Sequence, residues 1–281
     1  MKVLILSDLH MDYGKNGYLT MKKEAVIKDL GANFDCILLC GDNAEFDGEF
    51  FNHKRLFRFL RNRFSCPLGF IIGNHELWSG RFISPEMLLY KHFKDIALEE
   101  GLVYLEDQNL TINNWTIAGT YAHYDYSLGR ISHGITKENF IIGVAKINGV
   151  DYQWIDKNFI YWEKPDEDIC SDLTSGFENR IKNVERKLIT ISHTVPNQDL
   201  IGHENSLKQD FYGAFSGTIK LEEIIKKFPI DYHFCGHTHA RTQAPIGGAL
   251  AMNVGMDYDR WSHLILNTEN RSIERFFKQL D

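Results

Sequence analysis

The sequence lacks features that would place the protein in a membrane or outside the cell. It contains no run of about 18 apolar residues, the length that a membrane-spanning helix needs. Its first residues, MKVLILSD, contain a short apolar run without a cleavage site, so we expect no signal peptide. The five cysteines are odd in number and lack the spacing of a disulfide framework. These absences predict a cytoplasmic protein with no membrane segment.

An excess of positive charge is also missing. The 38 Asp and Glu residues outnumber the 31 Lys and Arg residues, and the formal net charge is -7 with the two signs interspersed. Because nucleic-acid surfaces neutralise phosphates with Lys and Arg, this composition argues against a nucleic-acid partner. We found no internal repeat, low-complexity tract or linker, so we expect residues 1–281 to form one domain.

Short apolar runs alternate with helical patterns in the first hundred residues. The apolar runs are Val3–Leu6, Cys36–Cys40 and Pro67–Ile72, and the helical patterns cover Lys22–Leu30 and Phe50–Phe64. This alternation predicts a parallel sheet with helical crossovers. Polar residues with ligand-type side chains follow each apolar run, which predicts a ligand site at the carboxyl ends of the strands.

The rest of the chain predicts a second group of strands. A helix is expected over Ser84–Glu99, with Ser84 as its N-cap. Further strands are expected at Leu102–Leu105, Leu110–Ile112, Trp115–Gly119, Lys187–Ser192 and Ile230–Cys235. The tail suggests antiparallel strands that complete a second sheet, at Gln243–Ile246, Ala249–Asn253, Ser262–Asn267 and Ser272–Phe277. Residues 121–185 show a looser pattern, which we interpret as an insertion or cap, with an amphipathic helix at Val150–Trp162.

Five short motifs stand at the ends of the expected strands. In chain order they are Asp8-Leu9-His10, Gly41-Asp42-Asn43, Gly73-Asn74-His75-Glu76, Ser192-His193 and Gly236-His237-Thr238-His239. Their side chains offer oxygen and imidazole donors. Alternate residues of a strand point the same way, so Asp8 and His10 can face one point, as can His237 and His239. The motifs therefore predict a metal centre.

The last motif has a second interpretation. Cys235, His237 and His239 alternate along the chain, and Cys and His are the usual ligands of a small zinc site. No further Cys or His cluster is left to complete such a site, so we expect Cys235 to pack as a small buried side chain. His233 shares this alternation, but its place inside the strand favours a core or supporting role.

Taken together, the five motifs resemble the signature of the calcineurin-like metallophosphoesterases, which is D-x-H, G-D, G-N-H-[DE], H and G-H-x-H. They stand in this order between residues 8 and 239. The resemblance implies an α/β fold, a four-layer α/β/β/α sandwich of two mixed β-sheets flanked by helices. It also implies a metal-dependent phosphoric ester hydrolase, in which a hydroxide bridging two metal ions attacks a phosphomonoester or phosphodiester of a small molecule.

The resemblance further implies two sets of metal ligands that share Asp42. One set is Asp8, His10, Asp42 and His239, and the other is Asp42, Asn74, His193 and His237. Such mixed imidazole and carboxylate ligands suit two divalent ions of Mn, Fe, Zn, Co or Ni better than Mg or Ca. His75 would be the general acid at the leaving-group oxygen, with Glu45 or Asp47 orienting its ring.

The segment "YAHYDYS", Tyr121–Ser127, has two interpretations of equal standing. His123, Tyr124 and Tyr126 could line the substrate pocket, or they could belong to an ordinary packed aromatic loop.

Three rival functions are weaker. Phe46 occupies the position of the substrate-binding arginine in the G-D-x-x-D-R-G motif of protein Ser/Thr phosphatases, which argues against that subgroup. A nuclease would need a basic stripe, and a non-catalytic scaffold would not need all five motifs. The sequence leaves open the substrate, the preference for monoester or diester, the metal, any protein partner, the oligomeric state and the role of the insertion.

Overall fold

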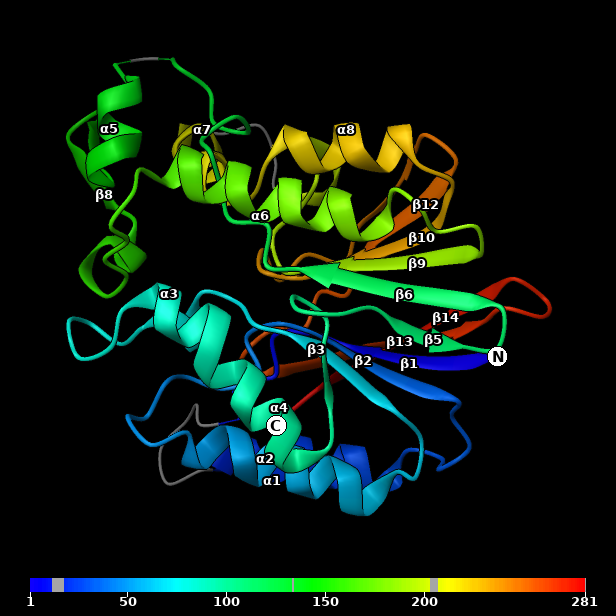
Figure 1. The fold of residues 1–281 in the computed structure, drawn as a ribbon. Coiled ribbons are helices and arrows are strands. Elements are labelled where there is room, and N and C mark those ends of the chain that lie inside the picture. The colour runs from blue at the N-terminus through cyan, green and yellow to red at the C-terminus, as the bar shows by residue number, and fades with distance from the viewer. Residues whose placement is uncertain (12–17, 133, 203–206, 281) are drawn as a thin grey trace.

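Two mixed six-stranded β-sheets lie face to face at the centre of the molecule (Figure 1). The computed structural model describes residues 1–11, 18–132, 134–202 and 207–280. The first sheet contains, in spatial order, β14 (Ser272–Gln279), β13 (Arg260–Asn267), β1 (Lys2–Leu6), β2 (Cys36–Cys40), β3 (Leu68–Ile71) and β4 (Val103–Tyr104). The second contains β11 (Gln243–Ile246), β12 (Ala249–Asn253), β10 (Ile230–Cys235), β9 (Lys187–Ser192), β6 (Trp115–Thr120) and β5 (Leu110–Ile112).

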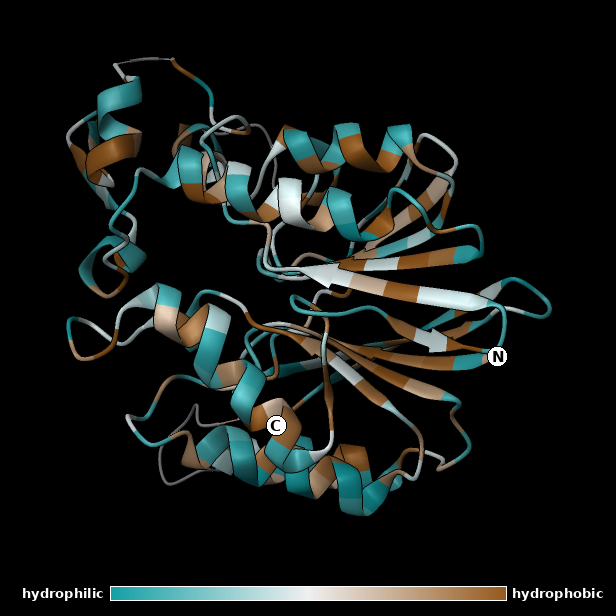
Figure 2. Cartoon of the chain, viewed as in Figure 1, coloured by the Kyte–Doolittle hydropathy of each residue, from teal (hydrophilic) through white to brown (hydrophobic). Residues whose placement is uncertain are grey.

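Helices cover the outer face of each sheet, which confirms the expected four layers. The first sheet is covered by α1 (Tyr18–Asp29), α2 (Phe51–Arg63) and α4 (Phe93–Glu100), and the second by α6 (Asp166–Ile181) and α8 (Ile219–Lys227) (Figure 1). Hydrophobic residues line the facing surfaces of the layers (Figure 2). Within β1, Val3 and Ile5 pack between the sheets, whereas Leu4 and Leu6 pack toward the helices. Burial on both faces explains why the strand is a continuous apolar run.

The predicted helix over Ser84–Glu99 is present but not uniform. The Ser84 side chain accepts a hydrogen bond from the backbone N–H of Met87, at the start of the short helix α3 (Pro85–Met87). A π-helical turn at Leu88–His92 then joins α3 to α4. A π-helical turn inserts an extra residue into a helix, which the apolar spacing of the sequence did not reveal.

The prediction that all four tail strands complete the second sheet is wrong for the last two. β13 and β14 extend the first sheet, where β13 runs antiparallel to β1. β12 belongs to the second sheet but pairs with β10 in parallel. Side chains of β13 are buried on both faces, with Trp261 toward the helices and Leu264 between the sheets. That pattern suits an interior strand of either sheet, so the sequence could not decide between them.

Residues 121–185 form two structurally different parts. The first contains α5 (Lys137–Ile142), the hairpin of β7 (Val144–Ile147) and β8 (Val150–Gln153), and a 3₁₀ turn at Ile155–Asn158. The helix predicted over Val150–Trp162 is therefore wrong. Its sequence signal was overridden by Asn148 and Gly149, which adopt φ of 50° and 81° and form the hairpin turn that an Asn-Gly pair favours. The second part, α6, packs on β6 of the second sheet.

The remaining described elements connect the layers near the ends of the strands. They are the helix α7 (Leu207–Tyr212) and the 3₁₀ turns His75–Leu77, Gln198–Leu200 and Gly213–Phe215. Among the described residues, no helix has the length and apolar composition needed to cross a bilayer.

His233 occupies a core position in β10, as expected. It is fully buried, and its ring nitrogens lie 2.9 Å from the Thr190 hydroxyl and 3.1 Å from the Ser192 hydroxyl. Because the Ser192 hydroxyl donates to the carbonyl of Thr194, it accepts a hydrogen bond from His233. Burial lowers the pKa of His233 from its ordinary value of 6.5 to about 3, so the folded protein holds this ring neutral.

This pKa predicts that acid weakens the fold through His233. The unfolded chain binds a proton on His233 below pH 6.5, whereas the folded protein binds it only near pH 3. Stability is therefore lost as pH falls through this window, by about 1.4 kcal/mol per pH unit for this residue. Urea unfolding of chelator-treated protein at pH 7, 6 and 5 should show His233→Gln with a correspondingly smaller loss than the wild type. Parallel losses would contradict the assignment.

Candidate metal centre

The loops that follow β1, β2, β9 and β10 meet at one point between the two sheets. The backbone N–H of Asp8 donates to the carbonyl of Gly41, and the N–H of Gly236 donates to the carbonyl of His193, both at 3.0 Å. Across the sheets, the N–H of His237 donates to Oδ1 of Asp8 at 2.9 Å. Backbone hydrogen bonds thus join the strand ends within each sheet, and the Asp8 carboxylate joins the two sheets.

Five of the expected ligands share an unusual backbone conformation. Positive φ angles between 41° and 70° occur at Asp8, His10, Asp42, His237 and His239. The strands end before these residues, so the expectation that strand alternation turns their side chains to one point is wrong. Left-handed backbone costs a non-glycine residue on the order of 1–3 kcal/mol, and it persists where surrounding contacts impose it, most often at functional sites.

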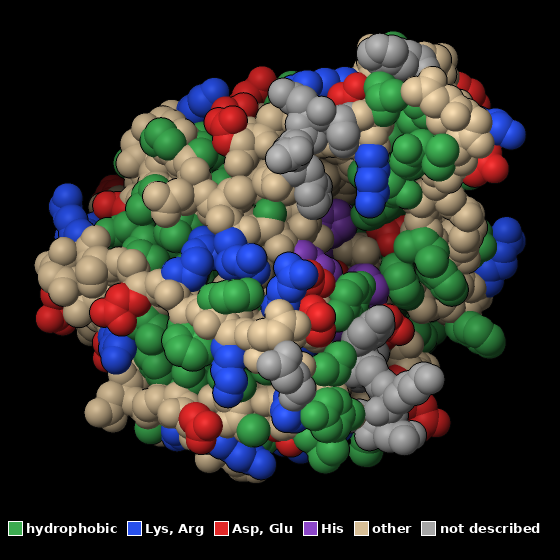
Figure 3. Space-filling view, turned by 180° about the vertical axis from the view of Figure 1, so that it is seen from behind, with side chains coloured by type: hydrophobic (Ala, Val, Ile, Leu, Met, Phe, Trp, Pro, Cys, Tyr) green, Lys and Arg blue, Asp and Glu red, His purple; other side chains and the backbone are tan. Residues whose placement is uncertain are grey.

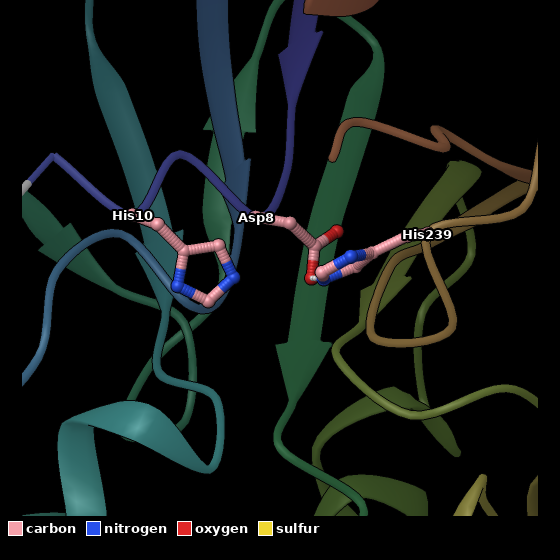
Figure 4. Close-up of side chains that lie close together, drawn as sticks. All are labelled: Asp8, His10 and His239. Carbon is pink, nitrogen blue, oxygen red and sulfur yellow. Dashed lines mark ion pairs between the residues drawn. The ribbon is translucent and has the colours of Figure 1, made fainter. Parts of the chain in front are cut away.

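Asp8, His10 and His239 form the first cluster of donors (Figure 4). Each offers one ligand atom, and these atoms lie within 4.8 Å of one another. Nε2 of His239 is 3.6 Å from Oδ1 of Asp8. Oδ2 of Asp8 and both ring nitrogens of His10 are buried and have no hydrogen-bond partner among the described residues. Buried polar atoms rarely stay unpaired, so this cluster has the character of a binding site.

Asp42, His193 and His237 form the second cluster. Oδ2 of Asp42 lies 3.4 Å from Nε2 of His193 and 3.8 Å from Nε2 of His10. Asp42 therefore stands between the two clusters. Burial would lower the pKa of His193, but the charge and hydrogen bond of Asp42 raise it to about 9. The surroundings of this ring favour positive charge.

Hydrogen bonds on the far side of three rings select the nitrogen that faces the centre. Nδ1 of His193 donates to the carbonyl of Cys40 at 2.9 Å, and Nε2 of His237 donates to the carbonyl of Phe215 at 3.0 Å. Nδ1 of His239 donates to the carboxylate of Asp257 at 3.2 Å. Each ring therefore turns its other nitrogen toward the centre. In the neutral ring this nitrogen carries a lone pair, as in metal-ligating histidines.

Asn74 brings a third acceptor to the same place. Its Nδ2 donates to Oδ1 of Asp156 at 3.0 Å, which turns its amide oxygen inward. That oxygen lies 3.0 Å from Nε2 of His193 and 3.0 Å from Nδ1 of His237. When both rings are neutral, the amide oxygen faces two nitrogen lone pairs with no hydrogen between them, an arrangement that a cation stabilises. The donor set therefore fits a divalent metal ion.

Two glycines leave the space that the clusters need. A Cβ on Gly73 would lie 2.2 Å from Oδ1 of Asp42, and a Cβ on Gly236 would lie 2.4 Å from Oδ2 of Asp8. Both distances are far below van der Waals contact, so any side chain here would displace a donor.

His75 lies at the edge of the centre. Its Nδ1 is 3.2 Å from Oε1 of Glu45, its Nε2 is 3.9 Å from Oδ2 of Asp42, and its ring stacks on Trp78 with centroids 3.8 Å apart. Burial would lower the pKa of His75, but the charges of Asp42 and Glu45 raise it to about 9. The prediction that Asp47 could orient His75 is wrong, because the Asp47 carboxylate accepts hydrogen bonds from backbone N–H groups at the start of α2.

The structure decides between the two interpretations of "YAHYDYS". His123 is fully buried, with Nε2 2.8 Å from Asp166, and the Tyr126 hydroxyl donates to the same carboxylate. Tyr124 is 2% exposed and packs against Phe215. The polar groups of His123 and Tyr126 are satisfied inside the protein, and none of the three residues lines the pocket of the metal centre. The prediction of substrate contacts is therefore corrected in favour of the packed aromatic loop.

Cys235 also belongs to the core. It is fully buried, and its thiol lies 3.7 Å from the carbonyl oxygen of Met252. Burial raises the pKa of this thiol well above its ordinary range, which opposes the thiolate form that binds zinc. The clusters that could hold a metal among the described residues do not include it.

Sequence reasoning missed several residues that support the centre. Glu76 accepts hydrogen bonds from the backbone N–H groups of Gly73, Asp42 and Asn43 at 2.7–3.0 Å. Asp156 and Asp257 orient Asn74 and His239, and no local motif marks either carboxylate. Further missed residues that line the pocket are Trp78, Trp154 and Tyr258. Of these residues, only Glu76 could have been recognised from the sequence, because it belongs to one of the five motifs.

Comparison with known families agrees with this geometry. The family model of calcineurin-like phosphoesterases matches residues 1–241. The chain belongs to the calcineurin-like phosphoesterases. It is therefore a metal-dependent phosphoric ester hydrolase, as the motifs predicted, and the family implies divalent metal ions.

Solved structures of this phosphoesterase fold are similar at low sequence identity. Phosphopantetheinyl hydrolase from Mycobacterium tuberculosis matches with a TM-score of 0.69 and 18% identity, over 90% of this chain and 88% of that chain. A putative 5'-nucleotidase from Staphylococcus aureus matches with a TM-score of 0.47 and 15% identity, over 99% of this chain and 54% of that chain. No curated protein sequence matches. At these identities the likeness concerns the fold alone.

We predict that Gly73→Ala removes bound metal from this phosphoesterase. The new Cβ would lie 2.2 Å from Oδ1 of Asp42 and 2.6 Å from Nε2 of His193, so both donors must move. Elemental analysis after gel filtration should show most of the metal lost. Gly248→Ala is the matched control, because nothing lies within 4 Å of its Cβ position. Full metal content in Gly73→Ala would refute the role of the second cluster.

Asp156 is predicted to act as a positioning residue. It is 1% exposed, and Oδ1 accepts from Asn74 at 3.0 Å and from the indole of Trp78 at 2.7 Å. Asp156→Ala should weaken metal binding by about 10- to 100-fold, the range seen for residues that orient metal ligands. Calorimetric metal titration measures this effect. Asp151→Ala serves as the control, since its side chain on β8 is 82% exposed; equal affinities in the two variants would contradict the prediction.

Proposed function

We propose that this phosphoesterase hydrolyses phosphomonoesters or phosphodiesters of small molecules with two divalent transition-metal ions. The observation that carries the proposal is the convergence of donors in two clusters, with Asp42 of the second cluster 3.8 Å from His10 of the first. The first ion would be held by Asp8, His10, Asp42 and His239, and the second by Asp42, Asn74, His193 and His237. When bound, two such ions would make a nucleophile of water at neutral pH and neutralise the phosphoryl group.

The chain's own residues divide the remaining work. Asp42 would reduce repulsion between two bound cations, and Asn74 would add a neutral oxygen that leaves positive charge for the substrate. His75 would donate a proton from Nε2 to the leaving-group oxygen, while Glu45 accepts from Nδ1. Stacking on Trp78, itself held by Asp156, keeps the ring in place.

Composition and organisation support the finer parts of the proposal. We infer a cytoplasmic location, since all five cysteines are free and buried. The net charge of -7 argues against the nuclease alternative. We also propose one domain over residues 1–281, in which a cap at about 121–185 supplies Trp154 and Asp156 to the centre.

Metal removal and restoration test the proposed function. Chelator-treated protein should be inactive on p-nitrophenyl phosphate and bis(p-nitrophenyl) phosphate, and added Mn or Zn should restore turnover of at least one. Two ions per chain should be bound at full activity. Absence of turnover with Mn, Fe, Zn, Co and Ni on both esters would favour the non-catalytic scaffold instead.

The role of His75 is tested separately. Because Nε2 of His75 also lies near His10 and Asp42, the geometry alone would permit a ligand role. As general acid, His75→Asn should keep its metal and lose about 10²- to 10⁴-fold in turnover of alkyl phosphates. The loss should be smaller for p-nitrophenyl esters, whose leaving group needs no proton. A parallel loss of bound metal would identify His75 as a ligand.

A further inference from the structure

A second pocket adjoins the metal centre and opens from it. It has a volume of about 350 Å³, within the range of small-molecule sites. It shares Trp154, His237 and His239 with the pocket that contains Asp42 and Asn74. Figure 3 shows histidine side chains inside a hollow, with hydrophobic, Lys or Arg, and Asp or Glu side chains around it. A phosphoryl group at the metal ligands would therefore have its organic part within reach of the second pocket.

Two aromatic rings form a corner of this pocket. Trp154 stacks on Phe215 with centroids 4.9 Å apart and an angle of 9°, so one face of its indole is fixed against the protein. Tyr212 lies 6.1 Å from Trp154 at an angle of 60°, and its hydroxyl donates to the carbonyl of Gln153. Rings held in this way can stack on a flat group with little loss of side-chain entropy.

The charge of the pocket differs from that of the metal centre. Of the described residues that line it, none is acidic, and Lys208 is the one with a fixed positive charge. The ammonium of Lys208 lies 5.8 Å from the ring centroid of Tyr212, above the aromatic corner. By contrast, Asp42 and Asp156 line the pocket of the metal centre. An anionic group would thus be attracted to the second pocket as well as to the metal ions.

The cap connects the two pockets through adjacent residues. Trp154 forms the shared wall, and Asp156, two residues later, holds the amide of Asn74. A group that packs against Trp154 therefore contacts the same segment that orients a proposed metal ligand.

We propose that the second pocket binds the organic part of the substrate and selects phosphoesters that carry a planar ring and a second anionic group. The ring would pack in the corner of Trp154 and Tyr212, and the anion would face Lys208. This inference rests on the proposed function, because it places the phosphoryl group at the metal ligands.

Equilibrium binding to the Mn-loaded protein tests the charge selection without turnover. The probes are inorganic phosphate, phenylphosphonate and 4-carboxyphenylphosphonate, measured by calorimetry. In the wild type, the carboxylate should tighten binding about fivefold over phenylphosphonate, the upper range of an exposed ion pair. Lys208→Glu should abolish or reverse this preference. Lys146→Glu is the control, because Lys146 is an exposed lysine of the cap on β7, outside the pocket.

A second pair of variants tests the aromatic corner. Trp154→Leu and Tyr212→Leu should each weaken phenylphosphonate about tenfold, the scale of one aromatic stack. Tyr212→Leu should leave inorganic phosphate unchanged, because Tyr212 does not line the pocket of the metal centre. If phosphate binds but the carboxylate gives no preference, or if neither variant affects phenylphosphonate, the pocket proposal is overturned and the metal function stands. If phosphate does not bind to the metal-loaded wild type, both proposals fall.

Discussion

The convergence of the amide oxygen of Asn74 with ring nitrogens of His193 and His237 is the constraint on which the rest of the site depends. The Asn74 oxygen lies 3.0 Å from each of the two ring nitrogens, so positive charge at this point, as a proton on His193 or as a metal ion, is favourable. The protein holds them there by tying down the opposite side of each group, through the carbonyls of Cys40 and Phe215 and the carboxylate of Asp156. The folded chain therefore holds these three atoms together as a site for a cation.

The backbone around the centre is built to keep that arrangement. Glu76 accepts three backbone N–H groups from the loops after β2 and β3, which fixes Asp42 and Gly73 relative to each other. Five expected ligands have positive φ angles, so these contacts override the backbone conformation that the residues would otherwise prefer. The left-handed backbone and the close approach of the donors occur together, because the packed sheets hold both in place.

The motifs allowed much of the fold and centre to be predicted, because each motif combines a strand end with a donor. The chain positions of β1, β2, β9 and β10 followed from buried apolar runs, and the donors after them do meet. Asp156 and Asp257 could not be predicted, since a single carboxylate in a loop has no pattern and acts through tertiary contacts. The sequence also could not predict which sheet β13 joins, because burial on both faces does not indicate which strand pairs with it.

The hydrogen bond from the backbone of His237 to Asp8 joins the end of β10 in one sheet to the end of β1 in the other. Because donors come from both sheets, a cation that binds here also fastens the two halves of the sandwich together. Ligands that bind only the folded state shift the folding equilibrium by mass action. Metal supply would therefore control how much folded protein is present, and not only how fast each molecule works.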